Sequence, residues 1–171
     1  MAERMAIVVL MVAVSAMSRG SQAVGEEAQA TIHAEDEVAI KRICLERIER
    51  FNKTHEPPRA AEFTPDADFV NVYGMWRKGA AEIEARQGER MKTVLKEAKI
   101  TSLDLRIRFI RPDVAIAHQT QEMTGMLSPD GQKMPPHRER SIRVLVKERG
   151  KWLTTAFHNT IVRDAEPLSP R

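Results

Sequence analysis

The hydrophobic periodicity of the chain changes from a helical to a strand-like spacing near residue 100, and this change limits the folds that it can adopt. Before residue 100, apolar residues recur at three- and four-residue steps, first in the series Ile40, Ile43, Cys44, Ile48 and Phe51. That spacing predicts an amphipathic helix over 35–52. After it, every second residue from Leu103 to Phe109 is apolar, as in a strand with one buried face. The order predicts an α+β domain, with N-terminal helices packed on a curved antiparallel sheet.

Prolines, glycines and turn residues divide the rest of the chain into shorter elements. We expect a short helix over 57–63, a turn at 64–66, a strand over 68–73 and a second amphipathic helix over 79–99. The later strands are expected at 103–109, 114–127, 138–148 and 152–162, with a hairpin loop at 128–137. These elements make one domain over 31–163, followed by a flexible tail at 164–171.

The first thirty residues have the anatomy of a secretory signal peptide. Arg4 precedes an apolar run over 5–14, and small residues with cleavage-like spacing follow up to Ala30. The run is shorter than the roughly 20 apolar residues that span a bilayer. We therefore expect export to the periplasm or the medium, with no stable membrane association after cleavage. The alternatives are an uncleaved anchor, or a start at Met5 or Met17 and a cytoplasmic protein.

The composition excludes several classes of protein. The 171 residues carry a net charge of +3 and are 42% hydrophobic, as in an ordinary globular protein. A single cysteine excludes a disulfide scaffold. No metal-ligand spacing and no glycine-rich phosphate loop occurs in the sequence, so we expect neither a metal nor a cofactor. Basic residues alternate with Glu122, Glu139 and Glu148, which indicates a solvated outer sheet face and not a nucleic-acid site.

Four motifs, in this order, resemble the nuclear-transport-factor-2-like superfamily, which has a cone-shaped α+β fold. They are the segments 64–74, 74–83, 106–115 and 152–160, which include Asp66-Ala67-Asp68-Phe69-Val70-Asn71, Met75-Trp76-Arg77, Arg111-Pro112-Asp113 and Phe157-His158-Asn159. Together they are most similar to the SnoaL-like group called the SgcJ/EcaC family, over residues 34–163. This fold hosts isomerases, dehydratases, cyclases and non-catalytic binding domains, so the resemblance implies a pocket but not a reaction.

Strand alternation predicts which side chains face that pocket. The residues expected to face inward are Leu105, Ile107, Phe109, Ala117, Gln119, Gln121, Met123, Ile142, Val144, Val146, Leu153, Thr155, Phe157 and Asn159. The opposite faces are expected to carry Arg143, Trp152, His118 and His158 among others. A single β-bulge would exchange the two sets.

The predicted inward faces carry more polar side chains than an apolar core requires. Asn71, Tyr73, Gln119, Gln121 and Asn159 are predicted to form a neutral hydrogen-bonding ligand site, or alternatively to bond one another. Phe157 and Arg47 are added as ligand-binding candidates, and Trp76 and the 128–137 loop as a gate. Arg47 lies near the apolar helix stripe, and extension to the solvent edge is the favoured interpretation over a position in the cavity.

The resemblance also tests for a known chemistry of the fold. An ungapped alignment places Asn71 where ketosteroid-isomerase relatives have the proton-shuttling carboxylate, and Arg47 where they have an oxyanion tyrosine. An amide cannot shuttle a proton, so that reaction is disfavoured. Gln87 and Gln121 replace a histidine and a tryptophan that are frequent in the SgcJ/EcaC pattern. His158 and His118 remain as candidate catalytic bases if a bulge turns either of them inward.

Three functions are therefore open. The first is an exported protein that binds a small apolar or mixed-polarity molecule. The second is an isomerase, cyclase or dehydratase with a pocket histidine. The third is an interaction module whose pocket is vestigial and filled by Phe109, Phe157 and Met123. A homodimer is also expected, through an outer face with Trp152, Leu145 and Ile110.

Overall fold

The computed structural model describes residues 33–163, in two units. Residues 33–38 belong to the first unit and begin a helix that runs over 33–54, and residues 39–163 belong to the second unit, which holds every other element. The predicted signal peptide at 1–30 and the predicted tail at 164–171 lie outside the described residues.

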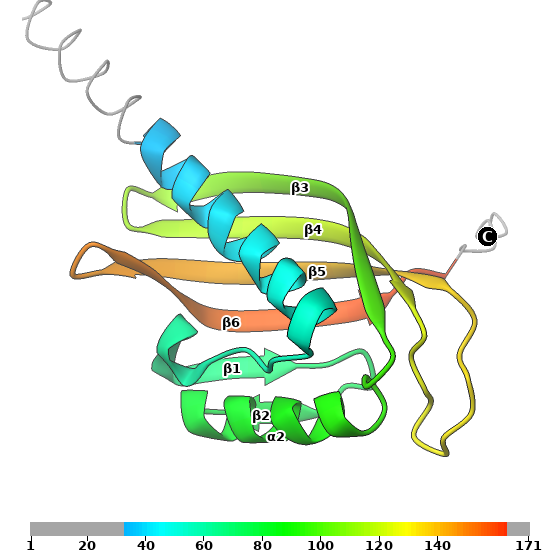
Figure 1. Ribbon diagram of the computed structural model, residues 1–171. Helices are drawn as coiled ribbons and strands as arrows, with labels where there is room; N and C mark the ends of the chain where they lie inside the picture. The colour runs from blue at the N-terminus through cyan, green and yellow to red at the C-terminus, as the bar shows by residue number, and fades with distance from the viewer. Residues whose placement is uncertain (1–32, 164–171) are drawn as a thin grey trace, which may run out of the picture. The chain divides into compact units, whose positions relative to one another are not determined.

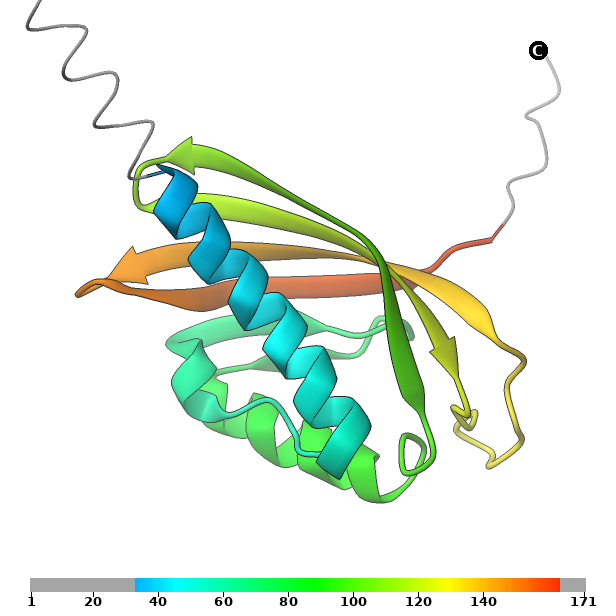
Figure 2. The same ribbon diagram turned by 45° about the horizontal axis from the view of Figure 1, so that its top comes forward.

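The second unit is built on one six-stranded sheet (Figure 1). Its strands are β1 (Phe63–Val70), β2 (Trp76–Lys78), β3 (Lys99–Arg111), β4 (Val114–Thr124), β5 (His137–Glu148) and β6 (Lys151–Ile161). The strand order is β2-β1-β6-β5-β4-β3, and all neighbours are antiparallel except β1 and β6, which are parallel. The sheet is curved and does not close (Figure 2). Two helices pack on it, which confirms the predicted α+β cone fold.

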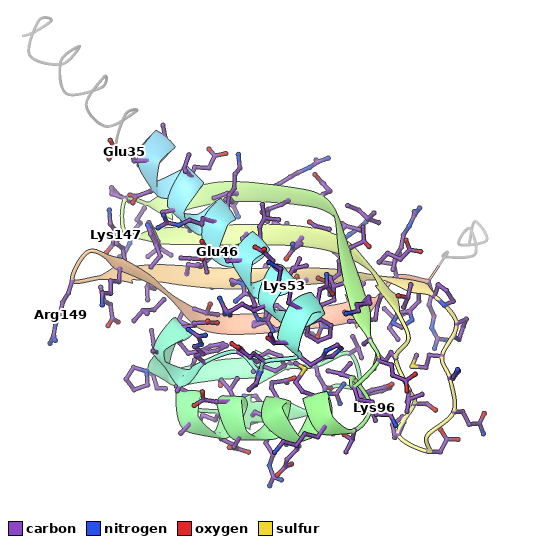
Figure 3. The ribbon with its side chains drawn as sticks, in the orientation of Figure 1. Glu35, Glu46, Lys53, Lys96, Lys147 and Arg149 are labelled. Atoms are coloured by element: carbon purple, nitrogen blue, oxygen red, sulfur yellow. The ribbon has the colours of Figure 1, made fainter. Side chains whose placement is uncertain are left out.

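The residues of the 33–54 helix that belong to the second unit pack on the sheet through the predicted apolar stripe. Ile40 and Cys44 are buried with Leu145 and Trp152 of the β5–β6 hairpin. Phe51, one turn from the end of the helix, is buried in another cluster with Met91, Leu95, Ala98, Met123 and Met126. Glu46 and Lys53 are exposed and lie on the solvent side of the helix (Figure 3).

The second helix, α2 (Ala80–Lys92), ends earlier than its apolar pattern predicts. The amide of Thr93 bonds the Arg90 carbonyl, and the chain then continues in turns up to Ala98. Leu95 and Ala98 are buried although they follow the helix. Their apolar spacing therefore led the sequence prediction to extend the helix too far. Among residues 33–163, neither helix is long and apolar enough to cross a membrane.

The region 57–78 differs from the sequence prediction in three ways. A single 3-10 turn, η1 (Ala60–Glu62), replaces the expected helix over 57–63. The predicted turn at 64–66 lies inside β1, because the register against β6 shifts between Phe63 and Asp68 and so accommodates Pro65, which has no N–H to donate. The short strand β2 was not predicted, and it pairs Trp76 with Val70 across a turn at 71–75.

The largest correction concerns the faces of β5 and β6. Glu139, Ser141, Arg143 and Leu145 are buried on β5, whereas Ile142 is 36% exposed, so the predicted inward set of Ile142, Val144 and Val146 is wrong. On β6, Val144 pairs with Ala156 and Leu145 with Thr154, which leaves Thr155 as an extra residue. This β-bulge turns Trp152 and Thr154 inward in place of Leu153 and Thr155.

The same bulge removes two residues from the predicted dimer face. Trp152 and Leu145 are buried, at 7% and 0% exposure, and Trp152 packs edge-on against Phe109. Ile110 is exposed. The homodimer itself stays a prediction.

Gly125, at the end of β4, gives a test of this packing. It has a φ of +70°, and a Cβ there would overlap the Glu97 carbonyl oxygen, whereas Gly131 has a φ of +83° with open space around it. We expect Gly131→Ala to cost about 1 kcal/mol of unfolding free energy for the backbone conformation alone, and Gly125→Ala to cost about 1–3 kcal/mol more because the close approach must open. Urea denaturation measures both variants. Equal losses would contradict the close approach.

Candidate functional site

A cavity lies between the two helices and the sheet within the second unit. It contains about 70 Å³ of space that the centres of water molecules can occupy, which is enough for several waters. Its apolar walls come from two of the buried clusters and include Phe51, Met91, Leu95, Met123, Met126, Phe69 and Phe157. The polar residues that line it are Arg47, Glu56, Asn71, Gln87, Arg90, Gln121, Glu139 and Asn159.

The most buried acid in this cavity is Glu139 of β5, which is only 2% exposed. Its Oε2 accepts hydrogen bonds from Gln121 Nε2 at 3.1 Å and from Asn159 Nδ2 at 2.9 Å. The three residues meet because Gln121 pairs directly with Glu139 across β4 and β5, and Asn159 lies on the adjacent strand β6. Its Oε1 lies 3.4 Å from Nε2 of His137. Two amide donors stabilise a carboxylate that burial would otherwise penalise.

Two amide side chains in this cavity retain unused hydrogen-bonding capacity. Asn159 Oδ1 is buried and has no partner. Gln87 on α2 is 5% exposed, and its amide has no hydrogen bond to any residue within 33–163. By contrast, Asn71 Oδ1 is occupied, because it accepts from the amides of Tyr73 and Met75 at 2.9 and 3.1 Å and so holds the 71–75 turn. A buried polar atom without a partner costs about 1–3 kcal/mol.

Arg47 also lines the cavity, and its Nε is buried without a partner. Its guanidinium carbon lies 5.5 Å from the centroid of the Phe157 ring. Burial, with the nearby charge of Arg143, lowers the pKa of Arg47 well below its ordinary value, to about 9. A cation–π contact contributes about 0.5–2 kcal/mol, less than the several kcal/mol that burying an unpaired charge costs. Arg47 is half-buried and lines the cavity, so the expectation that it extends to the solvent edge in preference to the cavity is wrong.

Arg90 on α2 adds a second cationic side chain to the lining. It lies over the Tyr73 ring, 5.9 Å from the centroid, and burial lowers its pKa, while Tyr73 and Glu139 act in the opposite direction. Burial raises the pKa of Tyr73, whose hydroxyl contacts the Met134 sulfur at 3.3 Å. The cavity is therefore polar at several points and apolar between them.

The structure brings together some of the predicted site residues and separates others. Arg47, Asn71, Gln121, Phe157 and Asn159 line the cavity. The following predicted residues are not among its lining: Tyr73, Trp76, Gln119, His118 and His158. Gln119 is buried and donates to Ser102 Oγ at 3.2 Å, while Trp76 is 58% exposed and donates to Asp68 at 2.7 Å.

The two strand histidines are placed on the exposed side of the sheet. His118 alternates with buried Ala117 and Gln119, and His158 alternates with Phe157 and Asn159, which line the cavity. The bulge at Thr155 precedes His158 and does not turn it inward. His137, which was predicted at the end of the hairpin loop, is the histidine closest to the buried acid.

Sequence reasoning missed Glu139, Gln87 and Arg90 as lining residues. Glu139 was placed on a solvated outer face because alternation assigned the apolar residues of β5 to the interior. A signal was present, since Glu139, Ser141 and Arg143 share one face of β5 and a pocket recruits polar side chains from such a face. Gln87 was noted as a departure from the family pattern. Within residues 33–163, no three His, Cys, Asp or Glu side chains cluster as metal ligands would.

Solved structures share this fold. A protein of uncharacterised function with a cystatin-like fold from Caulobacter vibrioides is 30% identical, over 75% of this chain and 91% of that chain, with a TM-score of 0.71. An NTF2-like protein of unknown function from Pseudomonas putida is 15% identical, over 80% and 98% of the two chains, with a TM-score of 0.64. A candidate scytalone dehydratase from Novosphingobium aromaticivorans is 15% identical, over 83% and 99%, with a TM-score of 0.63. No family model and no curated protein matches the chain.

The burial of Arg47 predicts an unusual dependence of stability on pH. The pKa of Arg47 in the folded chain, about 9, lies well below its ordinary value in the unfolded chain, so the unfolded chain binds more protons as the pH rises above 9. The loss of folding stability caused by the charged Arg47 is therefore complete below pH 9 and becomes smaller as the pH rises. The groups that act on Arg47 are Arg143, Glu62, Cys44 and Arg50. We expect Arg47→Met to be more stable than the wild type at pH 8, and the difference to shrink by about 1 kcal/mol by pH 10.

Guanidinium denaturation at both pH values measures this difference. Arg42→Met on the exposed face of the same helix, where the side chain is 70% exposed, is the control and should show no change with pH. A constant difference between Arg47→Met and the wild type would contradict the burial of an unpaired cation.

Proposed function

The chain belongs to the nuclear-transport-factor-2-like superfamily, and from that premise we propose that it binds a small molecule of mixed polarity in the cavity around Glu139. One observation carries the proposal: a fully buried carboxylate, fixed by two amides, lines an otherwise largely apolar cavity beside a carbonyl oxygen that has no partner. Convergent polar groups in an apolar concavity are the usual sign of a ligand site.

The unpaired polar atoms of the cavity indicate which hydrogen-bonding groups the ligand carries. Asn159 Oδ1 and the Glu139 carboxylate accept hydrogen bonds, so the ligand supplies a donor such as a hydroxyl or an N–H. Gln87 offers both a donor and an acceptor from the opposite wall, on α2. The aromatic and methionine side chains between them suit an apolar body, and methionine adapts to varied shapes.

The vestigial-pocket alternative receives less support from the packing. It requires Phe109, Phe157 and Met123 to fill the cavity. Phe109 instead packs against Trp152, and Phe157 stacks on Phe69 at a centroid distance of 4.7 Å, which leaves both Phe157 and Met123 in the cavity wall.

An enzyme is the second candidate, and the Glu139–His137 contact favours it. A buried carboxylate beside an imidazole, at the edge of an apolar cavity, could take a proton from a bound ligand and return it. The role that the sequence suggested for His158 or His118 then passes to Glu139, with His137 in support. The exact reaction, the export of the chain and the SgcJ/EcaC grouping stay predictions.

Native mass spectrometry of the full chain, followed by denaturing extraction, tests the binding proposal. We expect a small molecule at up to one per chain, released on denaturation. Glu139→Gln should lower its occupancy about tenfold, because a charge-assisted acceptor is lost. Glu148→Gln, at the exposed end of the same strand, should keep it. An empty wild type, or equal occupancy in Glu139→Gln, would count against the proposal.

Proton exchange in D₂O separates the enzyme from the binding protein. If Glu139 transfers a proton, the extracted molecule gains deuterium at a carbon position in the presence of the wild type, as measured by mass spectrometry. His137→Gln should slow this exchange, and Glu139→Gln should abolish it. Exchange at the rate seen without protein would leave binding as the function.

A further inference from the structure

We propose that the cavity selects a ligand that bears a carboxylate, and that this carboxylate binds the guanidinium of Arg47. The inference rests on the proposed small-molecule site and deepens it, because it names the charged group that the site recognises.

The first support is that the protein leaves Arg47 without a counter-charge. Its Nε is buried with no hydrogen-bond partner, and no residue within 33–163 accepts a hydrogen bond from its guanidinium or forms an ion pair with it. The residue nevertheless lines the cavity, on the same side as Ile48 and Phe51 of its helix. A guanidinium has five N–H donors, and a buried donor without a partner, such as Nε of Arg47, is costly.

The second support is the charge of the surroundings. The charged neighbours that act on Arg47 are Arg143, Arg50 and Glu62. Glu62 is already paired with Arg50, and Arg143 donates to Thr154 Oγ1 at 3.0 Å without a carboxylate. Three cations therefore share one anion. The pKa of Arg47, about 9, still leaves it charged at neutral pH, so the groups that act on Arg47 carry an excess of positive charge at its end of the cavity, which a bound anion would balance.

The third support is the aromatic ring of Phe157, which both Arg47 and Arg143 contact. The guanidinium carbons of Arg47 and Arg143 lie 5.5 and 5.0 Å from the Phe157 centroid. Phe157 is in turn held by its stack on Phe69. This contact satisfies none of the N–H groups of Arg47, so its hydrogen-bonding fork remains available for a planar, bidentate acceptor.

The lining favours a carboxylate over a phosphate. Glu56 and Glu139 also line the cavity, and they would repel a dianion more strongly than a single negative charge. The space, about 70 Å³ for water centres, is small, and its walls are mainly apolar. Since Asn159 Oδ1 and Glu139 require a donor, the ligand class is a small carboxylic acid with an apolar body and a hydroxyl or amino group.

A matched pair of probes tests this inference, namely 4-hydroxybenzoate and its neutral isostere 4-hydroxybenzamide. Titration calorimetry on the full chain at pH 7 should show that the wild type prefers the acid by about tenfold or more. Arg47→Met should lose this preference, chiefly by weaker binding of the acid. Arg42→Met, an exposed arginine on the same helix, should keep it. Arg47→Lys, which retains the charge but not the fork, should fall between them.

The outcomes are distinguishable from those of the binding proposal. If the amide binds as tightly as the acid in the wild type, the carboxylate inference is wrong and the small-molecule site stands. The same conclusion follows if folded Arg47→Met retains the preference for the acid. If neither probe binds and no molecule is extracted from the purified chain, both proposals fail. The wild-type comparison needs no variant, so misfolding of Arg47→Met does not obscure it.

Discussion

The pairing of β5 with β6 is the constraint on which the site depends. Glu139, Ser141, Arg143 and Leu145 occupy one continuous face of β5, and the extra residue Thr155 lets β6 match that face at both ends. At one end Trp152 and Thr154 turn into the core, and at the other Phe157 and Asn159 turn toward the cavity. Without the bulge, one of these two ends would face solvent. The register of β6 against β5, with its bulge, therefore places the side chains of both the core and the site.

The site combines a satisfied polar cluster with unsatisfied groups. Glu139 is fixed by Gln121 and Asn159, so its geometry is preorganised before any ligand arrives. Arg47 Nε and Asn159 Oδ1, by contrast, are buried without a hydrogen-bond partner, which costs folding stability. Such a cost is typical of functional sites, where stability is given up for recognition. A ligand that pairs with both groups would recover it, so binding and stability should be linked in this protein.

Much of the fold could be predicted because periodicity reports local packing. The stripe from Ile40 to Phe51 predicted a helix that the structure extends to 33–54, and the alternating segments after residue 100 became β3 to β6. The face of β5 could not be predicted, because alternation assigns apolar residues inward and this strand points its polar residues into a cavity. Arg47 was misjudged for a related reason. A long cation normally reaches solvent, and only the packing of Phe157 and Arg143 around it shows otherwise. Asn71, Gln121 and Asn159 were identified correctly as lining residues, since their strands kept the predicted phase at those positions.

A crystal structure of the purified full chain, at a resolution that distinguishes ordered small molecules from water, tests whether the cavity binds a ligand through Arg47. We expect Arg47 to point into the cavity, with a non-protein acceptor within hydrogen-bond distance of its guanidinium, at about 2.7–3.2 Å. We also expect a donor near Asn159 Oδ1. An Arg47 side chain extended into solvent, with the cavity closed by Met123 and Phe157, would contradict both proposals, because no space would then remain for a ligand beside Glu139.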